Sequence, residues 1–434
     1  MKKLRDAVHK DIRLSAAEVA AMDTAEMQRL RGIRQLGAAY LVYPSAQHTR
    51  FEHGLGTLWM ARRIVSQIES GTDFTFPDQE RQAVFLAALV HDATHIPFGH
   101  TFEDERRLLE RHDESEARFG RLLAGGELGE VLRASPAGRL ALELLRPGGE
   151  PPEGRAYLRQ IVSGTVCADL LDYLKRDNYF CGLSYEFDER VFHYFRIAEG
   201  RLAVDMQHGG ILRRDALTEI TNLLRIRYVL SERVYYHHAK IAAGVMISKA
   251  VQRAMEAGLR EEDLCTLSDG TLLYRLSRDF GDDEGISALM AGLRARRLYK
   301  RVYMASRQIG EENVRRLVAR YHLNRNGERE EAERRIAEAL GEPRHRVAVY
   351  CAPAGMALKE AEVPVLVPGG RMTLLSRLNS DEIQVLKQKH RALWTLYVFI
   401  SPELGGIADE AGRVSAQIIG HPNELPARRR GSVL

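Results

Sequence analysis

The sequence contains few cysteines, and none of them are paired at a metal-binding spacing. Four cysteines occur among 434 residues, at positions 167, 181, 265 and 351. Their wide separation excludes a CxxC metal site, and so low a number in so long a chain excludes a disulfide framework. We therefore expect reduced, structural thiols.

Long apolar runs and a dominant charge are also missing. No segment approaches the roughly 18 uncharged apolar residues of a membrane span, and the start MKKLRDAVHKDIRL lacks the apolar core of a signal peptide. The formal net charge is only +4, with 28% charged residues. We predict a cytoplasmic protein without a membrane partner, and the composition gives no indication of nucleic-acid binding.

Strand patterns are scarce in the first three quarters of the chain. From residue 16 to residue 310 apolar residues recur mostly near the helical period, apart from a short ribbon expected at residues 201–210. Residues 311–341 are a charged, helix-like run, and residues 342–434 carry Val-, Leu- and aromatic-rich strand patterns. The predicted fold is mainly α: a helical body (1–310), a helical connector (311–341) and a smaller C-terminal α+β module (342–434) whose tail, from residue 424, is disordered.

Ionisable residues interrupt one strongly apolar helix pattern. In LAALVHDATHIPFGH, His91 and Asp92 follow directly on the apolar run, and His95 and His100 come soon after. A buried, unpaired carboxylate costs several kcal/mol, so these groups require partners. For the adjacent pair alone, a core histidine beside a capping aspartate remains an open interpretation.

Two other apolar segments carry similar groups. AQHTRFEHGLGT places His53 near the start of a helix, and VCADLLDYLKRDNYF contains Asp169, Asp172 and Asp177. One shared cation would satisfy groups from all three helices. Imidazole and carboxylate ligands suit a divalent Fe, Mn, Ni, Zn or Mg ion.

The order His, His-Asp, Asp resembles the HD-domain phosphohydrolase superfamily. The segments MQRLRGIRQLG, VYPSAQHTRFEHGLG, LVHDATHIPFGH and DLLDYLKRDNYFCGL look like its deoxynucleotide triphosphohydrolase branch, the family of the SAM and HD domain protein. The resemblance covers roughly residues 1–250. It implies a metal-dependent, homo-oligomeric enzyme that converts a dNTP into deoxynucleoside and triphosphate. The implied metal ligands are His53, His91, Asp92 and Asp169.

The resemblance also implies roles for further residues. The implied catalytic residues are Arg50, His95, His112 and Asp113, the last two as a pair in which the aspartate polarises the histidine. The implied substrate contacts are Gln35, Leu36, His100, Tyr173, Asp177, Arg233 and His237. Residues matching an activating guanine-nucleotide site are Asp23, Gln28 and Arg31, although a surface helix explains the last two equally well.

One position departs from the family pattern. The triphosphate hydrolases commonly carry a lysine or arginine directly after the last metal aspartate, where this chain has Leu170. Loss of a cation weakens binding of a polyphosphate, and Arg233 or Lys175 are the candidate replacements. Two alternatives therefore stay open: a phosphatase or nuclease acting on nucleoside monophosphates or nucleic-acid ends, and a nucleotide-sensing regulator with little catalysis.

Overall fold

The computed structural model describes residues 2–426, and most of the expected disordered tail lies outside this range. The fold is mainly helical with small sheets, which confirms the predicted fold class. The helices of the first half are α1 (Ala16–Met22), α2 (Ala25–Arg29), α3 (Arg50–Gly71), α4 (Asp78–Val90), α5 (Glu116–Arg118), α6 (Gly126–Arg133), α7 (Pro136–Leu145), α8 (Tyr157–Ser163) and α9 (Ala168–Cys181). Those of the second half are α10 (Arg214–Leu230), α11 (His238–Glu256), α12 (Glu261–Leu264), α13 (Asp269–Asp279), α14 (Glu284–Arg294), α15 (Glu311–Leu317), α16 (Glu328–Ala339), α17 (Asp381–Ala392) and α18 (Ala408–Ile419).

The strands form four small sheets among the described residues. Their bounds are β1 (Lys2–Asp6), β2 (Lys10–Leu14), β3 (Phe195–Ala198), β4 (Arg201–Asp205), β5 (Gln207–His208), β6 (Ile211–Leu212), β7 (Lys300–Ser306), β8 (Val347–Cys351), β9 (Pro364–Val367), β10 (Arg371–Leu374) and β11 (Thr395–Ile400). Two hairpins, β1–β2 and β5–β6, stand beside a sheet ordered β10-β9-β4-β3 and one ordered β7-β11-β8. The expected ribbon at residues 201–210 is therefore confirmed, whereas the N-terminal hairpin was not predicted.

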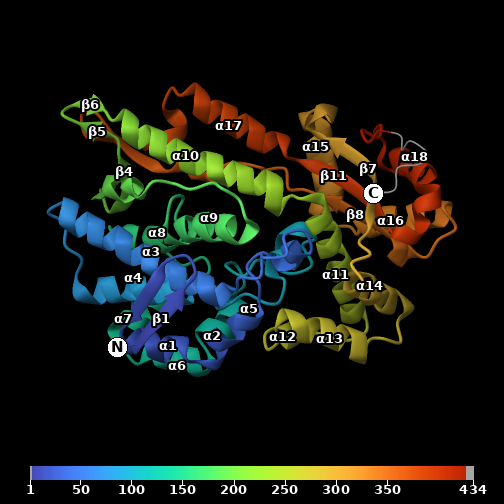
Figure 1. Cartoon of the computed structure of the whole chain (residues 1–434), viewed down its shortest axis with the longest axis horizontal. Coiled ribbons are helices and arrows are strands. Elements are labelled where there is room, and N and C mark those ends of the chain that lie inside the picture. The colour runs from blue at the N-terminus through green and yellow to red at the C-terminus, as the bar shows by residue number, and fades with distance from the viewer. Residues whose placement is uncertain (1, 427–434) are drawn as a thin grey trace.

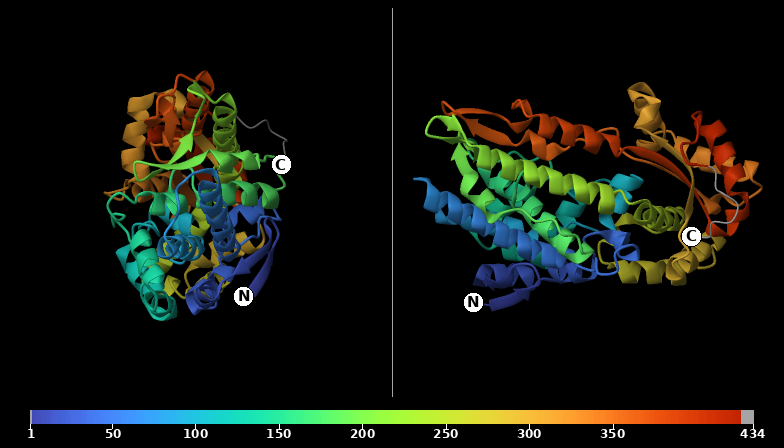
Figure 2. Two further views of the ribbon diagram at one scale, coloured as in Figure 1. Left: turned by 90° about the vertical axis from the view of Figure 1, so that its left-hand side faces the viewer. Right: turned by 45° about the horizontal axis from the view of Figure 1, so that its top comes forward.

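Two hydrophobic clusters organise the molecule. The first packs α3, α4, α9 and α10 together and includes Val365 of β9 and Leu386 of α17. The second packs α11 and α14 against Tyr303, Val349 and Val398 of the sheet β7-β11-β8. In both Figures 1 and 2, α17 runs alongside α10, while the second sheet lies at the far end of the elongated molecule.

The sheets β10-β9-β4-β3 and β7-β11-β8 each join distant parts of the sequence. β4 pairs in parallel with β9, and β7 pairs with β11. Residues before 310 therefore share sheets with residues after 342, and the division into body, connector and module stays a prediction.

The helical periodicity of residues 213–256 is continuous, but the structure forms two helices there, α10 and α11. A π-helical turn, Ser231–Tyr235, follows α10, and His237 caps the N-terminus of α11 by accepting the Ala239 N–H at 3.3 Å. Arg233 and His237 therefore do not lie on one face of a continuous helix. The local periodicity missed this break because apolar spacing continues through it.

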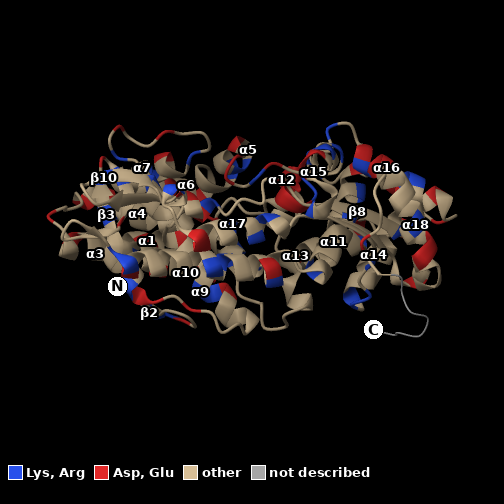
Figure 3. Ribbon diagram, turned by 90° about the horizontal axis from the view of Figure 1, so that it is seen from above, with Lys and Arg blue, Asp and Glu red and all other residues tan. Residues whose placement is uncertain are grey.

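Among the described residues, positive and negative side chains do not segregate to separate faces. Figure 3 shows basic and acidic residues interspersed along the ribbon. Within residues 2–426, no helix combines the length and the apolar composition needed to cross a bilayer.

Close packing of α3 on α4 generates a stability prediction. A Cβ on Gly54 would lie 2.6 Å from the Leu89 carbonyl oxygen. We expect Gly54→Ala to destabilise the protein by about 1–3 kcal/mol despite the better helix propensity of alanine. Chemical denaturation measures this change. Gly270→Ala, in α13 where a Cβ meets nothing within 4 Å, is the control and should be neutral or stabilising; equal behaviour of both variants would contradict the packing argument.

Candidate metal and nucleotide site

The start of α3 positions two site residues. Thr49 and Glu52 form a capping box, in which the Thr49 hydroxyl accepts the Glu52 N–H at 3.4 Å and the Glu52 carboxylate accepts the Thr49 N–H at 2.7 Å. This box begins the helix at Arg50 and places His53 one turn later. Both side chains point inward: Arg50 is 2% and His53 1% exposed.

The end of α4 supplies the next pair. Nδ1 of His91 donates to the Ala88 carbonyl at 2.9 Å, which leaves Nε2 with its lone pair. That Nε2 is buried and lacks a hydrogen-bond partner among the described residues. Asp92 accepts from Nη1 of Arg50 at 2.7 Å and lies 3.4 Å from Nε2 of His91.

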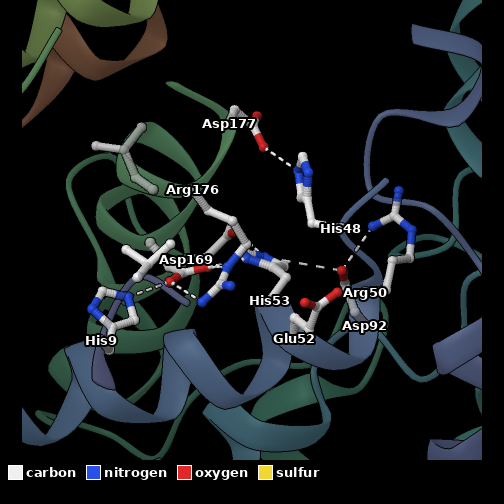
Figure 4. Close-up of polar contacts among 12 residues, drawn as sticks. His9, His48, Arg50, Glu52, His53, Asp92, Asp169, Arg176 and Asp177 are labelled. Atoms are coloured by element: carbon white, nitrogen blue, oxygen red, sulfur yellow. Dashed lines mark hydrogen bonds and ion pairs between the residues drawn. The ribbon is translucent and has the colours of Figure 1, made fainter. Parts of the chain in front are cut away.

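The first turn of α9 completes the cluster. Oδ1 of Asp169 lies 2.9 Å from Nε2 of His53 and 3.8 Å from Nε2 of His91. Oδ2 of Asp92 lies 4.0 Å from Nε2 of His53. Figure 4 shows His53, Asp92 and Asp169 meeting between their helices. The four predicted metal ligands are thus neighbours.

This donor set fits a divalent cation. One ligand atom each from His53, His91 and Asp169 lie within 4.8 Å of one another. Burial lowers the pKa of His53, but the hydrogen bonds that His53 makes to Asp169 and Asp172 outweigh this effect and raise that pKa to about 10. The carboxylates therefore create a strongly negative environment, and the unpartnered Nε2 of His91 offers a free lone pair to a metal ion.

Asp172 supports His53 from behind. Its Oδ2 accepts from Nδ1 of His53 at 2.8 Å, and its Oδ1 accepts from Nη2 of Arg176 at 3.0 Å. A Cβ on Gly56 would lie 1.9 Å from Oδ1 of Asp172, so this close approach of α3 and α9 requires glycine. The HGLG sequence signals the contact, but its partner could not be identified without the fold.

Three further histidines lie beside the four candidate metal ligands, which we call the metal cluster. The rings of His95 and His112 stack with centroids 3.6 Å apart, and that of His100 lies 5.0 Å from His95. Burial and the neighbouring Arg50 hold the pKa of His95 well below its usual value, so this histidine is neutral. Nε2 of His95 lies 3.3 Å from Oδ1 of Asp92, which joins the histidine group to the metal cluster.

Glu103, which the sequence analysis missed, is the carboxylate that holds His112. Its Oε2 lies 3.1 Å from Nδ1 of His112, and its Oε1 accepts from Arg118 at 2.7 Å. Asp113, the expected partner, instead pairs with Arg111 at 3.0 Å and has a side chain 56% exposed. His112 therefore pairs with Glu103, nine residues earlier, and not with its neighbour Asp113. This pairing arises because residues 101–105 form a π-helical segment beside His112.

A second polar group surrounds Asp177. This carboxylate is 1% exposed and accepts from Nε2 of His48 at 2.9 Å and from the Tyr235 hydroxyl at 2.6 Å. The guanidinium of Arg227 lies 5.3 Å from the ring centre of Tyr173 and 4.8 Å from that of Tyr235. Of these residues, only Asp177 and Tyr173 were predicted.

The loop before α3 approaches the same group. The backbone N–H of Gln35 donates to the His48 carbonyl at 3.0 Å, and Oε1 of Gln35 is buried without a hydrogen-bond partner in the described part of the chain. Leu36 is 9% exposed. His48 therefore connects the predicted Gln35 and Leu36 to Asp177.

The remaining residues considered for substrate binding contact other side chains. Arg233 is exposed, with its guanidinium 5.6 Å from the Tyr185 ring, and His237 stacks on His238. Lys175 pairs with Glu189 at 3.4 Å. Leu170 is 3% exposed in the first hydrophobic cluster.

The residues matched to a guanine-nucleotide site make surface contacts. Asp23 pairs with Lys2 at 3.2 Å. Arg31 donates to Gln28 at 2.8 Å and covers the ring of Phe51. These contacts suit the surface-helix interpretation.

Comparison with known families gives two matches. Residues 50–177 match the HD domain, and residues 196–420 match the HD associated region. The first match begins at Arg50 and ends at Asp177, so it contains the four clustered ligands. The second contains Arg227 and Tyr235.

Curated relatives include enzymes and an uncharacterized protein. A protein of Methanocaldococcus jannaschii, uncharacterized, is 34% identical over 311 residues, covering 69% of this chain and 59% of that protein. The deoxynucleoside triphosphate triphosphohydrolase SAMHD1 of Homo sapiens is 28% identical over 319 residues, covering 67% of this chain and 49% of that enzyme. The match thus spans about half to three fifths of these relatives.

Solved structures share the whole fold. A hypothetical protein from Aquifex aeolicus has a TM-score of 0.72 at 24% identity, covering 94% of this chain and 99% of that one. A phosphohydrolase from Bacteroides thetaiotaomicron has a TM-score of 0.70 at 23% identity, covering 92% of this chain and 100% of that one. These likenesses concern the fold alone. With the HD domain and the HD associated region matched in order along the sequence, the chain belongs to the HD-domain phosphohydrolase family.

Proposed function

We propose that the protein is a metal-dependent triphosphohydrolase that cleaves a dNTP into deoxynucleoside and triphosphate. The observation that carries the proposal is the cluster of His53, His91, Asp92 and Asp169 directly beside the histidine group that contains His95. The likeness to SAMHD1 supports the choice of a dNTP. A homo-oligomeric state is part of the proposal and rests on the resemblance.

The metal would be held by His53, His91, Asp92 and Asp169. When bound, a divalent ion at such a site activates water and neutralises phosphate charge. The chain's own residues orient these ligands: Ala88 holds His91 through its carbonyl, and Arg50 holds Asp92.

Arg50 and His100 supply positive charge for the substrate phosphates. Arg50 uses Nη1 on Asp92, while its Nε is buried and lacks a hydrogen-bond partner within residues 2–426. A planar guanidinium suits bidentate contact with phosphate oxygens. Burial lowers the pKa of His100, but Asp104, whose Oδ2 lies 2.9 Å from Nδ1, raises that pKa to about 9, so His100 is cationic near neutral pH.

His112 is the group that returns a proton to the leaving oxygen. The oxygen of water bonds to the α-phosphorus and the bond from phosphorus to O5′ breaks. O5′ takes a proton from Nε2 of His112 as the deoxynucleoside leaves, and the proton lost by the water replaces it on His112. Nδ1 of His112 donates a hydrogen bond to the Glu103 carboxylate, so the other ring nitrogen, Nε2, is left to face the reaction. The neutral ring of His95 stacks on His112 and fixes its plane.

Asp177 and Tyr173 form the proposed sugar subsite. The carboxylate of Asp177 accepts from the 3′-hydroxyl, and the ring of Tyr173 closes over the 2′ carbon. His48 and Tyr235 hold Asp177, while Arg227 lies over Tyr173. A 2′-hydroxyl would meet this ring, which favours deoxyribose.

A second candidate function follows from Leu170. This side chain is apolar and 3% exposed where related triphosphate hydrolases commonly have a cation. A substrate with fewer phosphates needs fewer cationic contacts. The second candidate is therefore a phosphatase or nuclease acting on nucleoside monophosphates or nucleic-acid ends.

A product assay separates the two candidates. With Mn²⁺ or Mg²⁺ present, we expect each active dNTP to release triphosphate, with little phosphate from dNMPs and little cleavage of single-stranded DNA. Asp92→Ala should lose the bound ion in elemental analysis and lower kcat/KM by more than about 100-fold, because outer-shell changes alone cost about 10–100-fold.

Asp78→Ala is the matched control, since Asp78 lies on the same helix, α4, with a side chain 84% exposed. It should retain ion and activity. Faster release from dNMPs than from dNTPs would transfer support to the second candidate, and an Asp92→Ala variant that kept both ion and activity would refute the metal site.

Sugar selection gives an independent prediction. We expect Tyr173→Ala to reduce the preference for a dNTP over the matching NTP by about tenfold, which corresponds to about 1.4 kcal/mol. Tyr173→Phe retains the ring and should retain the preference. Tyr179→Ala changes a tyrosine that is 60% exposed on the same helix and serves as control; the measurement is kcat/KM for both nucleotides. An unaltered preference in Tyr173→Ala would remove this residue from the sugar subsite.

Glu103 is expected to affect both chemistry and stability. Glu103→Gln leaves Arg118 without its buried anion, so we expect a loss of about 3 kcal/mol in unfolding free energy, together with a fall in kcat. Burial opposes ionisation of Glu103, but His100 and His112 hold its pKa far below its usual value.

The stability that Glu103 contributes is consequently present above its unfolded pKa of about 4.3 and is lost as the pH falls below it. The difference between wild type and Glu103→Gln should narrow in acid. Glu116→Gln, at a side chain 58% exposed, is the control and should change stability by less than about 0.5 kcal/mol. A pH-independent difference would contradict an ionised Glu103.

A further inference from the structure

The N-terminal hairpin reaches the interior behind the metal cluster. In the turn between β1 and β2, Oδ2 of Asp6 accepts the N–H groups of Val8 at 2.9 Å and His9 at 2.7 Å. This turn directs His9 inward, where it is 7% exposed. Its ring stacks on Trp59 of α3, with centroids 4.5 Å apart and planes inclined by 15°.

His9 contacts the carboxylate that holds His53. Nε2 of His9 lies 2.6 Å from Oδ1 of Asp172, and Nδ1 of His53 lies 2.8 Å from Oδ2 of the same residue. The guanidinium of Arg176 also donates to this carboxylate, through Nε at 2.8 Å and Nη2 at 3.0 Å. A carboxylate paired with a guanidinium accepts hydrogen bonds, so both histidines donate to it.

A second connection runs from the same hairpin. Arg176 donates through Nη1 to Oδ1 of Asp6 at 2.8 Å and through Nε to Oδ2 of Asp172 at 2.8 Å. Both Asp172 and Arg176 are completely buried, at 0% exposed. Oδ1 of Asp172 therefore contacts both His9 of the hairpin and Arg176, and Oδ2 contacts Arg176, which Asp6 of the hairpin holds. In the view of Figure 4, His9 and Arg176 lie on the side of His53 opposite Arg50.

The arrangement limits how the His53 ring can turn. With Nδ1 donating to Asp172, Nε2 is the ring nitrogen left for a metal ion, and it lies 2.9 Å from Asp169. Carboxylates that orient a metal-binding histidine strongly influence metal affinity. Here Asp172 is itself oriented by the hairpin β1–β2. His9 of this hairpin precedes Arg50, the first residue of α3, by more than 40 residues.

We infer that the hairpin β1–β2 is a working part of the metal site and that His9 is a positioning residue for His53, acting through Asp172. Asp6 contributes through Arg176. The inference rests on the proposed role of His53 as a metal ligand. It assigns a function to a hairpin that the sequence analysis did not predict.

The test uses variants of the full chain that separate the hydrogen bond from the packing. His9→Phe keeps an aromatic ring over Trp59 but removes the donor to Asp172. His9→Gln restores an N–H donor without the ring. Arg5→Ala removes an exposed ion pair with Asp11 in the same hairpin and leaves Asp172 untouched, so it is the matched control.

The first measurement uses titration calorimetry to determine the Kd of Mn²⁺ for the metal-free chain. We expect His9→Phe to raise the Kd for Mn²⁺ by about 10–100-fold, the range found for outer-shell partners. His9→Gln should recover to within about threefold of wild type, as estimated from a retained hydrogen bond. Arg5→Ala should equal wild type.

The Mn²⁺ dependence of dNTP hydrolysis is the second measurement. If His9 acts on the metal ligand, saturating Mn²⁺ should return kcat of His9→Phe towards wild type, whereas a loss of folded protein would not respond to metal. Thermal unfolding of the metal-free proteins gives the stability of each variant independently.

Three results would overturn the inference. A Kd unchanged in His9→Phe does so while leaving the proposed metal site intact. A weaker Kd that His9→Gln fails to restore, with a matching fall in thermal stability, shows a purely structural role. A wild-type chain that binds no Mn²⁺ refutes the proposed function, and the inference with it.

Discussion

The interaction on which the site depends is the pairing of His53 with two carboxylates of α9. Asp169 and Asp172 hold opposite nitrogens of this ring at 2.9 and 2.8 Å, so a side chain from α3 is fixed between two successive turns of another helix. The contact requires the helices to approach closely, which Gly56 permits. Removing these charged groups from water is costly, so the surrounding donors must be in place before the cluster is stable.

Local sequence patterns marked the candidate groups because each lies at a recognisable helix end, whereas the proposed ligand set came from the resemblance to a family. His53 follows a capping box, and His91 with Asp92 comes where an apolar run stops; the spacing along each helix then determines which groups face inward. The mainly helical fold followed from the same periodicity. Which helices meet depended on the resemblance to a family, since periodicity in one helix carries no information about its neighbour.

The missed residues are those whose roles arise only from tertiary contacts. Glu103 takes the place expected for Asp113 because a π-helical segment turns it towards His112. His48 and Tyr235 reach Asp177 from segments separated by 129 and 58 residues. Nothing in the residues around these positions distinguishes them from ordinary surface or core side chains.

The C-terminal region bears on the nucleotide side of the site rather than standing apart from it. Glu360 accepts from Nε of Arg227 at 3.2 Å, and Arg227 in turn lies over Tyr173 and Tyr235. The strand β9, a few residues later, pairs with β4. A contact that begins beyond residue 350 therefore helps to fix side chains from α9 and from the turn after α10. Burial and pairing of Arg227 therefore depend on that late segment, whereas the proposed metal ligands lie on α3, α4 and α9. We expect substitutions near Glu360 to act on the proposed sugar subsite more than on the metal ligands.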